Sequence, residues 1–310
     1  MLREAIKSGT VREHLFAAIL QIKSDLTAKD GRTYHVLDIS DSTCKLKLYL
    51  WSDSCPFKAK TFIKFKAGVM NNFFFCKLED IREVSPALIP EGNPVKNIQF
   101  RFNIDTAMLA HRIRTFAKAR VESDSFKLLI ESTVTQEFLD KLRPFPAGKS
   151  VHHSIEGGLL KHIEEMFDIY EKISEISICD NLRHEFVILG IVIHDYFKYR
   201  EYIPTDDSFA MTESASLLGH IYQGANFVQS LVQQFNASNR ENEISNSDKQ
   251  KLIHVILAHH GQLDWGSPVV PAIPEAMLLH YIDQISAKLN MFKNSTHMEF
   301  NKFLGAYPIL

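Results

Sequence analysis

Residues 185–198 read EFVILGIVIHDYFK, and this stretch decides how the second half of the chain folds. The apolar run 186–193, with Gly190 in its middle, predicts a helix that is hydrophobic on every side and is therefore buried. His194 and Asp195 follow this run directly. A polar pair at the end of a buried helix is unfavourable unless it is hydrogen-bonded, ion-paired or bound to a metal. The stretch therefore predicts a helical core that contains a polar site.

Histidines concentrate in the same part of the chain. Ten of the 14 histidines lie between positions 152 and 280, and the pattern of residues 150–294 is helical almost throughout. Imidazole nitrogens and carboxylate oxygens that converge from several helices suit magnesium, manganese or a first-row transition metal rather than an ion that prefers thiolates. The candidate ligands lie on separate predicted helices with apolar surroundings: His162, His194, Asp195, His220, His259, His260 and Asp283.

A single histidine of this kind is more often a hydrogen-bonded core residue than a metal ligand. We place His184, His254 and His280 in that core class. The remaining set is different because its members follow the order His, His-Asp, His, His-His and Asp, with each element on its own apolar helix. Packing alone is a poor explanation of that order, so the combination favours a metal site.

The first part of the chain has the periodicity of short strands. Strand patterns occupy about 75 residues, at 11–28, 33–41, 44–51, 61–68 and 71–84, with turn signals such as Lys29-Asp30-Gly31 between them. The segment CKLKLYLW (44–51) alternates cleanly, with leucines on one face and Lys45, Lys47 and Tyr49 on the other. Five strands in this length predict a small OB-type β-barrel.

One face of this barrel is expected to carry basic and aromatic side chains together. Such a face can follow a phosphate backbone and stack on bases, although a solvated lysine face explains the composition equally well. The candidate nucleic-acid-binding residues are Lys45, Lys47, Tyr49, Trp51, Lys64 and Lys66.

Charge divides the chain in the same way. Residues 1–90 carry 14 Lys and Arg against 10 Asp and Glu, a net +4, and the rest of the chain has a net −6. A basic module beside an acidic one is typical of a nucleic-acid-binding part next to a part that collects cations. The stretch SPALIPEGNPV (85–95) predicts a linker. We therefore predict a multidomain α+β protein: an OB-type barrel at 1–90, a linker and helical connection at 91–150, and an all-α domain at 151–310.

Composition excludes several other classes of protein. With 45% hydrophobic and 23% charged residues, the chain is typical of ordinary globular proteins and not of disordered ones. No uncharged apolar run approaches the ~18–20 residues of a membrane span. The N-terminal MLREAIKSGT lacks the apolar core of a signal peptide, so we expect a cytoplasmic protein with no membrane partner. The four cysteines form no CxxC pair and are expected to be reduced.

The order of these motifs resembles a known superfamily. The HD superfamily of metal-dependent phosphohydrolases holds metal in an all-helical domain with groups in the order of His162, His194-Asp195 and Asp283. The elements VHHSIEGGLLKH (151–162), HDYFK (194–198) and LAHHGQLDWGSPVVPAIPEAMLLHYIDQISAKLN (257–290), behind an OB-like module, are similar to the YhaM-type 3′→5′ exoribonucleases over residues 10–294. The family usually has a small residue, commonly Gly, where this chain has Phe197, which leaves the pocket wall and the substrate preference open.

The resemblance implies a divalent metal centre of one or two ions. We expect manganese, with magnesium, cobalt or iron as alternatives. His220 and His259 would hold a second ion, with His260 as the less certain ligand, and Asp195 would bridge the two ions. The first ion would be held by His162, His194, Asp195 and Asp283.

Three residues are candidates for the chemistry itself. Asp195 would hold metal, and Lys198 would place a cation on the scissile phosphate or protonate the leaving oxygen. His153 would contact phosphate or donate a proton, and its neighbour His152 is a weaker candidate.

These features fit three functions. The first is a metal-dependent 3′→5′ exoribonuclease that binds single-stranded RNA on the OB module and releases nucleoside 5′-monophosphates. The alternative is an HD-type phosphohydrolase of small nucleotides or cyclic dinucleotides, against which stand the OB module and the lack of a GYP signature. The third, a non-catalytic nucleic-acid-binding protein, is disfavoured because every ligand position is filled. DNA as a second substrate, assembly into a homo-oligomer and the biological pathway stay open.

Overall fold

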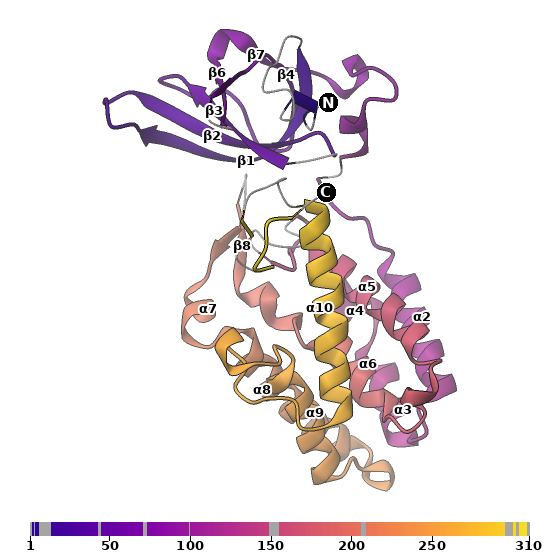
Figure 1. Cartoon of the computed structure of the whole chain (residues 1–310). Helices are drawn as coiled ribbons and strands as arrows, with labels where there is room; N and C mark the ends of the chain where they lie inside the picture. The colour runs from indigo at the N-terminus through magenta and orange to yellow at the C-terminus, as the bar shows by residue number, and fades with distance from the viewer. Residues whose placement is uncertain are drawn as a thin grey trace. The chain divides into compact units, whose positions relative to one another are not determined.

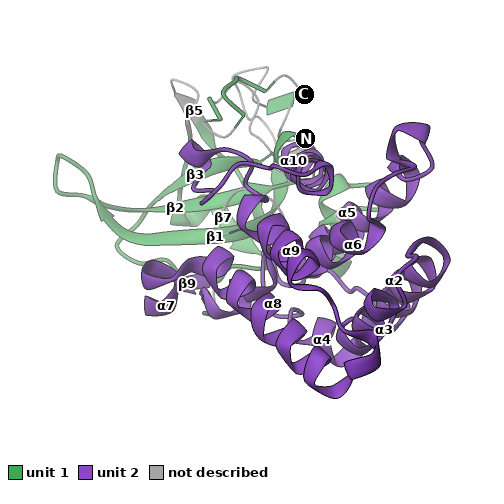
Figure 2. Ribbon diagram, turned by 90° about the horizontal axis from the view of Figure 1, so that it is seen from below, with its two compact units in different colours: residues 1–100, 205–208, 291–310 green, residues 101–204, 209–290 purple. Residues whose placement is uncertain are grey.

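The computed structural model confirms an α+β protein. It describes residues 2, 4–5, 14–42, 45–70, 73–98, 100–148, 155–205, 209–294, 300–301 and 304–308. The chain divides into two compact units, coloured separately in Figure 2. Residues 1–100, 205–208 and 291–310 form the first, here called the strand unit, and residues 101–204 and 209–290 form the second, the helical unit. Figure 1 labels their elements.

A seven-stranded sheet forms the strand unit. Its strands are β1 (Leu15–Thr27), β2 (Thr33–Ser40), β3 (Lys45–Trp51), β4 (Thr61–Phe65), β5 (Gly68–Met70), β6 (Phe73–Lys77) and β7 (Ile81–Glu83). Their order across the sheet is β5-β6-β3-β2-β1-β4-β7. Neighbours are antiparallel except β3 and β6, which are parallel. The sequence predicted five strands in this part of the chain, and the sheet has seven because residues 68–84 hold three short strands.

Strand β3 shows how the sequence selects a buried and an exposed face. Leu46, Leu48 and Leu50 are at most 6% exposed and join the core of the unit. The residues between them point to the other face, as the period of two requires. A second apolar cluster lies on the opposite face of β1 and β4, where Ala18 and Phe62 meet Ile89 and Val95. The proline-containing stretch after β7 therefore packs on the sheet.

Nine helices and one small hairpin are described in the other part of the chain. The hairpin pairs β8 (Tyr202–Pro204) with β9 (Phe209–Met211). The helices are α2 (Thr106–Arg120), α3 (Asp124–Thr133), α4 (Gln136–Asp140), α5 (Gly158–Ile173), α6 (His184–Ile193), α7 (Glu213–Leu217), α8 (Gly219–Ser238), α9 (Asn246–Ala258) and α10 (Pro274–Asn294).

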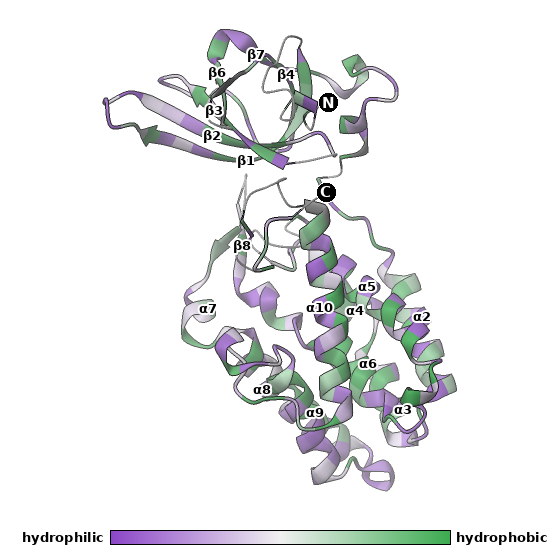
Figure 3. Ribbon diagram, viewed as in Figure 1, coloured by the Kyte–Doolittle hydropathy of each residue, from purple (hydrophilic) through white to green (hydrophobic). Residues whose placement is uncertain are grey.

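Helix α6 is the centre of the helical unit. Residues 185–193 are all buried, and Figure 3 colours this helix as hydrophobic. Gly190 permits the closest approach, because a Cβ atom at this position would lie 2.8 Å from side-chain atoms of both Val255 in α9 and Leu279 in α10. The predicted buried helix is confirmed. Its contacts bring α9 and α10 against α6 close to the point where α6 ends at His194.

None of the helices in the described ranges is long and apolar enough to cross a membrane.

Candidate metal centre

The candidate ligands come from five helices and meet in the helical unit. His162 lies in the first half of α5, and His194 ends α6. Asp195 follows at the start of a 3-10 turn (Tyr196–Arg200). The other four positions come from the start of α8, the end of α9 and the middle of α10, and all are buried or half-buried: His220, His259, His260 and Asp283.

One group of ligand atoms comes from His162, His194 and Asp283. One donor atom of each lies within 4.8 Å of the others. The Nε2 atom of His162 is 3.1 Å from Oδ1 of Asp283. Two imidazoles and a carboxylate at this separation form a ligand set with the chemistry that divalent ions of the first transition row prefer.

A second group of ligand atoms comes from His220, His259 and His260, again within 4.8 Å of one another. Asp195 lies between the groups. Its Oδ1 atom is 3.3 Å from Nε2 of His220 and 3.7 Å from Nε2 of His259. Its Oδ2 atom is 3.5 Å from Nε2 of His194. The two oxygens of this carboxylate therefore face different groups.

Hydrogen bonds at Nδ1 fix how the histidine rings are protonated. Nδ1 of His194 lies 3.1 Å from the carbonyl of Ile191, and Nδ1 of His259 lies 2.7 Å from the carbonyl of Ile256. Because a carbonyl oxygen only accepts, each Nδ1 carries the proton and each Nε2 keeps its lone pair. His260 is held in the same way by the carbonyl of Trp265, at 2.9 Å.

Two rings use side chains for the same purpose. His220 donates from Nδ1 to Oε1 of Glu201, at 3.0 Å. The Nδ1 of His162 is 3.0 Å from the hydroxyl of Ser286, which itself donates to Glu165 at 3.1 Å. Since the one hydroxyl proton of Ser286 goes to Glu165, the serine oxygen accepts from His162.

The ligand atoms that face the centre are buried and have lone pairs that no described hydrogen bond uses. Within the described ranges, four buried atoms there have no hydrogen-bond partner: Nε2 of His194, His220 and His259, and Oδ1 of Asp195. Buried polar atoms without partners are rare and call for an explanation such as an ion. Imidazole nitrogens with fixed outer hydrogen bonds and an ionised carboxylate are the usual surroundings of a bound metal. The residues present therefore fit a divalent ion.

Burial and neighbouring charges set the protonation states of His259, Asp195 and Lys198. Burial, and the nearby His260, hold the pKa of His259 well below its usual value, so the ring stays neutral. Burial alone would raise the pKa of Asp195, but the positive charge of Lys198 opposes burial, and this pKa lies well below its usual value. The carboxylate in turn raises the pKa of Lys198, whose Nζ is 2.5 Å away. At neutral pH the site thus contains the Asp195 carboxylate, the Lys198 ammonium and a neutral His259 ring.

Other residues named from the sequence have defined places. Lys198 also donates to the carbonyl of Ala147, at 2.8 Å. Phe197 is 5% exposed, and its ring lies 5.4 Å from those of Tyr196 and Phe227 in an aromatic cluster of the core. His152 and His153 lie outside the described residues.

The three histidines assigned to the core class make hydrogen bonds, as expected. His184 contacts the Tyr170 hydroxyl at 2.6 Å, and His254 accepts from the backbone of Ala272 at 2.9 Å. His280 donates to the carbonyl of His259 at 2.8 Å, which supports the loop that carries the two adjacent histidines.

The strand unit brings only some of the expected nucleic-acid-binding residues together. Lys45, Lys47, Tyr49 and Trp51 share one face of β3. Lys64 lies on β4, which β2 and β1 separate from β3, and its Nζ lies over the ring of Phe16. Lys66 is exposed just after the same strand. Alternation identifies the face of a strand but not its neighbours, so the sequence grouped residues from distant strands.

Two further residues lie beside Tyr49 and Trp51, and neither was predicted from the sequence as a nucleic-acid-binding residue. Tyr34 on β2 pairs with Trp51, and its ring centre is 5.3 Å from that of Trp51 and 6.0 Å from that of Tyr49. The guanidinium of Arg32 lies 4.7 Å from the Trp51 ring centre. We call Arg32, Tyr34, Tyr49 and Trp51 the aromatic face. The turn signal at residues 29–31 predicts a hairpin, and pairing across it could have revealed Tyr34.

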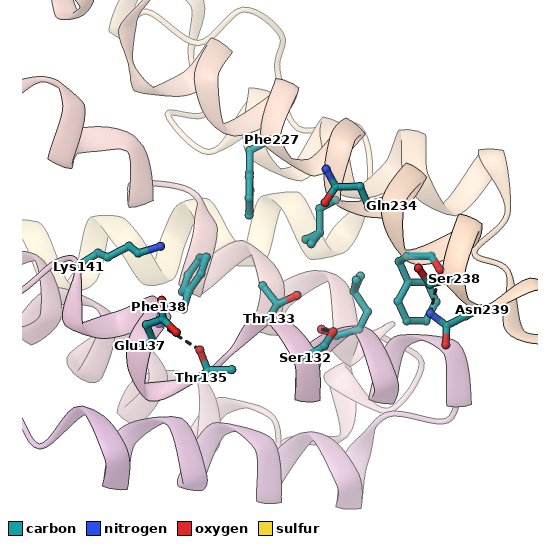
Figure 4. Close-up of a pocket in the computed structure, with 13 residues that line it drawn as sticks. Ser132, Thr133, Thr135, Glu137, Phe138, Lys141, Phe227, Gln234, Ser238 and Asn239 are labelled. Atoms are coloured by element: carbon teal, nitrogen blue, oxygen red, sulfur yellow. Dashed lines mark hydrogen bonds between the residues drawn. The ribbon is translucent and has the colours of Figure 1, made fainter.

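A separate cavity of about 450 Å³ lies between α3, α4 and α8 (Figure 4). Phe138 and Phe227 line it, and both also stack on Tyr196 beside Asp195. None of the site residues expected from the sequence lines this cavity.

Fold and site together define an α+β protein whose helical unit gathers candidate metal ligands and whose strand unit carries an aromatic face. No family model matches the chain. The chain is 28% identical over 283 residues to the 3′-5′ exoribonuclease YhaM of Bacillus subtilis, covering 85% of this chain and 81% of the relative. It is 26% identical over 301 residues to the 3′-5′ exoribonuclease YhaM of Oceanobacillus iheyensis, covering 94% and 89%. The resemblance expected from the motifs is confirmed.

The bridging position of Asp195 gives a direct test of the centre. We expect Asp195→Asn to lose bound manganese while keeping its helical content, because the amide retains the volume and an acceptor for Lys198 but not the charge. Metal content per chain and far-UV circular dichroism measure the two effects. Asp195→Ala should lose metal as well, and Asp180→Ala, at an exposed position, is the control. Wild-type metal content in Asp195→Asn would refute the assignment.

Proposed function

We propose that this chain is a metal-dependent 3′→5′ exoribonuclease that hydrolyses single-stranded RNA to nucleoside 5′-monophosphates. One observation carries the proposal. Ligand atoms of three histidines and Asp195, buried and without hydrogen-bond partners in the described ranges, converge in a chain whose relatives are named 3′-5′ exoribonucleases. The order of these residues along the helical unit supports an HD-type phosphohydrolase domain.

One or two divalent ions would occupy the centre, with manganese as the first candidate. His162, His194, Asp195 and Asp283 would hold the first ion. His220, His259, His260 and the second oxygen of Asp195 would hold the other. A bound divalent ion lowers the pKa of a coordinated water and neutralises phosphoryl charge.

Lys198 has the position and charge to assist the reaction. Two of its three N–H groups are used by the described contacts to Asp195 and Ala147, which leaves a third for a phosphoryl oxygen of the substrate. Because the Lys198 side chain is only 12% exposed, its charge is screened less by water than that of a surface lysine. Its contact with Asp195 also holds that carboxylate in place. His153 stays a proposed contact for phosphate or proton donor.

The strand unit would supply RNA binding. Its pairing of β1 with both β2 and β4, and of β3 in parallel with β6, supports an OB-type, partly open Greek-key barrel. OB domains bind oligonucleotides on the face of their second and third strands. The aromatic face lies there, with Lys47 exposed on the same face of β3. Rings would stack on bases and the cations would contact phosphates.

Degradation of RNA labelled at its 5′ end tests the activity. With manganese present we expect a ladder that shortens from the 3′ end and releases nucleoside 5′-monophosphates, because both relatives are named for this direction. Chelation of the metal should stop the reaction. Turnover of free nucleotides or cyclic dinucleotides with no loss of RNA would instead establish the small-molecule phosphohydrolase, and binding without turnover would indicate a non-catalytic protein.

Substitution of the aromatic face tests the role of the strand unit. We expect the variant Tyr34→Ala/Trp51→Ala to raise the KM for long single-stranded RNA by about tenfold or more, since stacking on one base is worth roughly 1–3 kcal/mol and ~1.4 kcal/mol is a factor of ten. A p-nitrophenyl phosphodiester reaches only the helical unit, so its turnover should not change.

The matched control for this variant is Tyr307→Ala, an exposed aromatic residue of the same unit. Equal losses on both substrates would show that the aromatic face supports the fold. An unchanged KM for RNA would show that it does not bind RNA.

A further inference from the structure

Glu201 is a buried carboxylate that contacts one candidate ligand twice. It is 7% exposed. A single oxygen, Oε1, accepts from the backbone N–H of His220 at 2.6 Å and from Nδ1 of the same residue at 3.0 Å. The carboxylate therefore fixes the start of α8, the orientation of the ring and the nitrogen that keeps its lone pair.

The backbone holds Glu201 firmly in this position. Its N–H donates to the carbonyl of Lys198 at 2.9 Å, and its own carbonyl accepts from the N–H of Thr212 at 3.0 Å. The chain enters α8 through Gly219, whose φ of +67° lies in the left-handed region that favours glycine. This turn directs the backbone N–H of His220 toward the carboxylate. Negative charge at a helix N-terminus is itself favourable.

The two ligand groups differ in charge. Glu201 contacts the group that has no carboxylate of its own. The first group contains the carboxylate of Asp283. The second consists of three imidazoles, and the carboxylate it meets directly is the shared Asp195. The outer nitrogens of His259 and His260 donate to neutral carbonyls, whereas that of His220 donates to Glu201. A carboxylate bound to the outer nitrogen of a histidine makes its inner nitrogen a stronger ligand.

We propose that Glu201 is a positioning residue for a second divalent ion, and that it sets the affinity of the His220, His259 and His260 group for that ion. The inference rests on the metal centre of the proposed function. It adds the residue that strengthens binding of the second ion by the three histidines. No signal in the sequence marks Glu201, because its contact with His220 forms only when the turn after Lys198 folds against the start of α8.

Titration of the metal-free protein with manganese alone, followed by native mass spectrometry and calorimetry, tests the proposal. Wild type should bind two ions. Glu201→Gln keeps the acceptor but removes the negative charge, so it should bind the first ion with unchanged affinity and the second about 10–100-fold more weakly, the usual effect of substituting an outer partner of a ligand. Glu165→Gln is the matched control: it acts through Ser286 on His162 and should leave the second ion's affinity unchanged.

The glutamine variant also separates positioning from a purely structural role. Its amide oxygen still accepts from the start of α8, so the unfolding temperature of the metal-free protein should stay near that of wild type. In a His220→Ala background, Glu201→Gln should have no additional effect on binding of the second ion, because the effect passes through that ring. Wild-type affinity for both ions in Glu201→Gln would overturn the proposal, as would an undiminished effect in the His220→Ala background.

The number of bound ions also distinguishes a failure of this proposal from a failure of the proposed function. A wild-type chain that binds one ion and still degrades RNA would overturn the role of Glu201 while leaving a one-metal exoribonuclease intact. A chain that binds two ions in the predicted way without degrading RNA would support Glu201 and refute the proposed function.

Discussion

The Asp195 carboxylate follows a helix whose last nine residues are buried, and the rest of the helical unit makes its charge tolerable there. An isolated charge in such a place would be neutralised or expelled. Here Lys198 contacts one oxygen, and histidines of three helices surround the group at 3.3–3.7 Å. Removing Lys198 or Asp195 would leave the charge of the other buried and uncompensated. The turn after α6 and the surrounding helices therefore depend on each other.

Packing around α6 explains why these helices meet at this carboxylate. Gly190 lets α9 and α10 approach the helix closely. One turn later the chain reaches His194, while α9 ends at His259 and α10 presents Asp283 one turn after Leu279. Outer hydrogen bonds then fix each ring, so the lone pairs face inward before any ion arrives. Such preorganisation lowers the ordering cost of binding.

The sequence predicted the features that depend on local pattern. The apolar run before His194 predicted the buried helix, and alternation in residues 44–51 predicted a strand with one basic and aromatic face. It did not reveal Glu201, Ser286 or Tyr34, because their roles come from contacts with residues distant along the chain. The same limit explains why Lys64 was grouped with Lys47: periodicity assigns a residue to a face, whereas strand order depends on how the whole sheet pairs.

Anomalous X-ray scattering at the manganese edge, from crystals grown with manganese, tests the central claim most directly. The account predicts a peak bonded to Asp195 and to inner nitrogens of the surrounding histidines, at about the 2.0–2.3 Å typical of divalent ions with nitrogen and oxygen ligands. Two peaks would correspond to the two ligand groups. Manganese bound only elsewhere, with Asp195 and the histidines uncoordinated, would contradict the account.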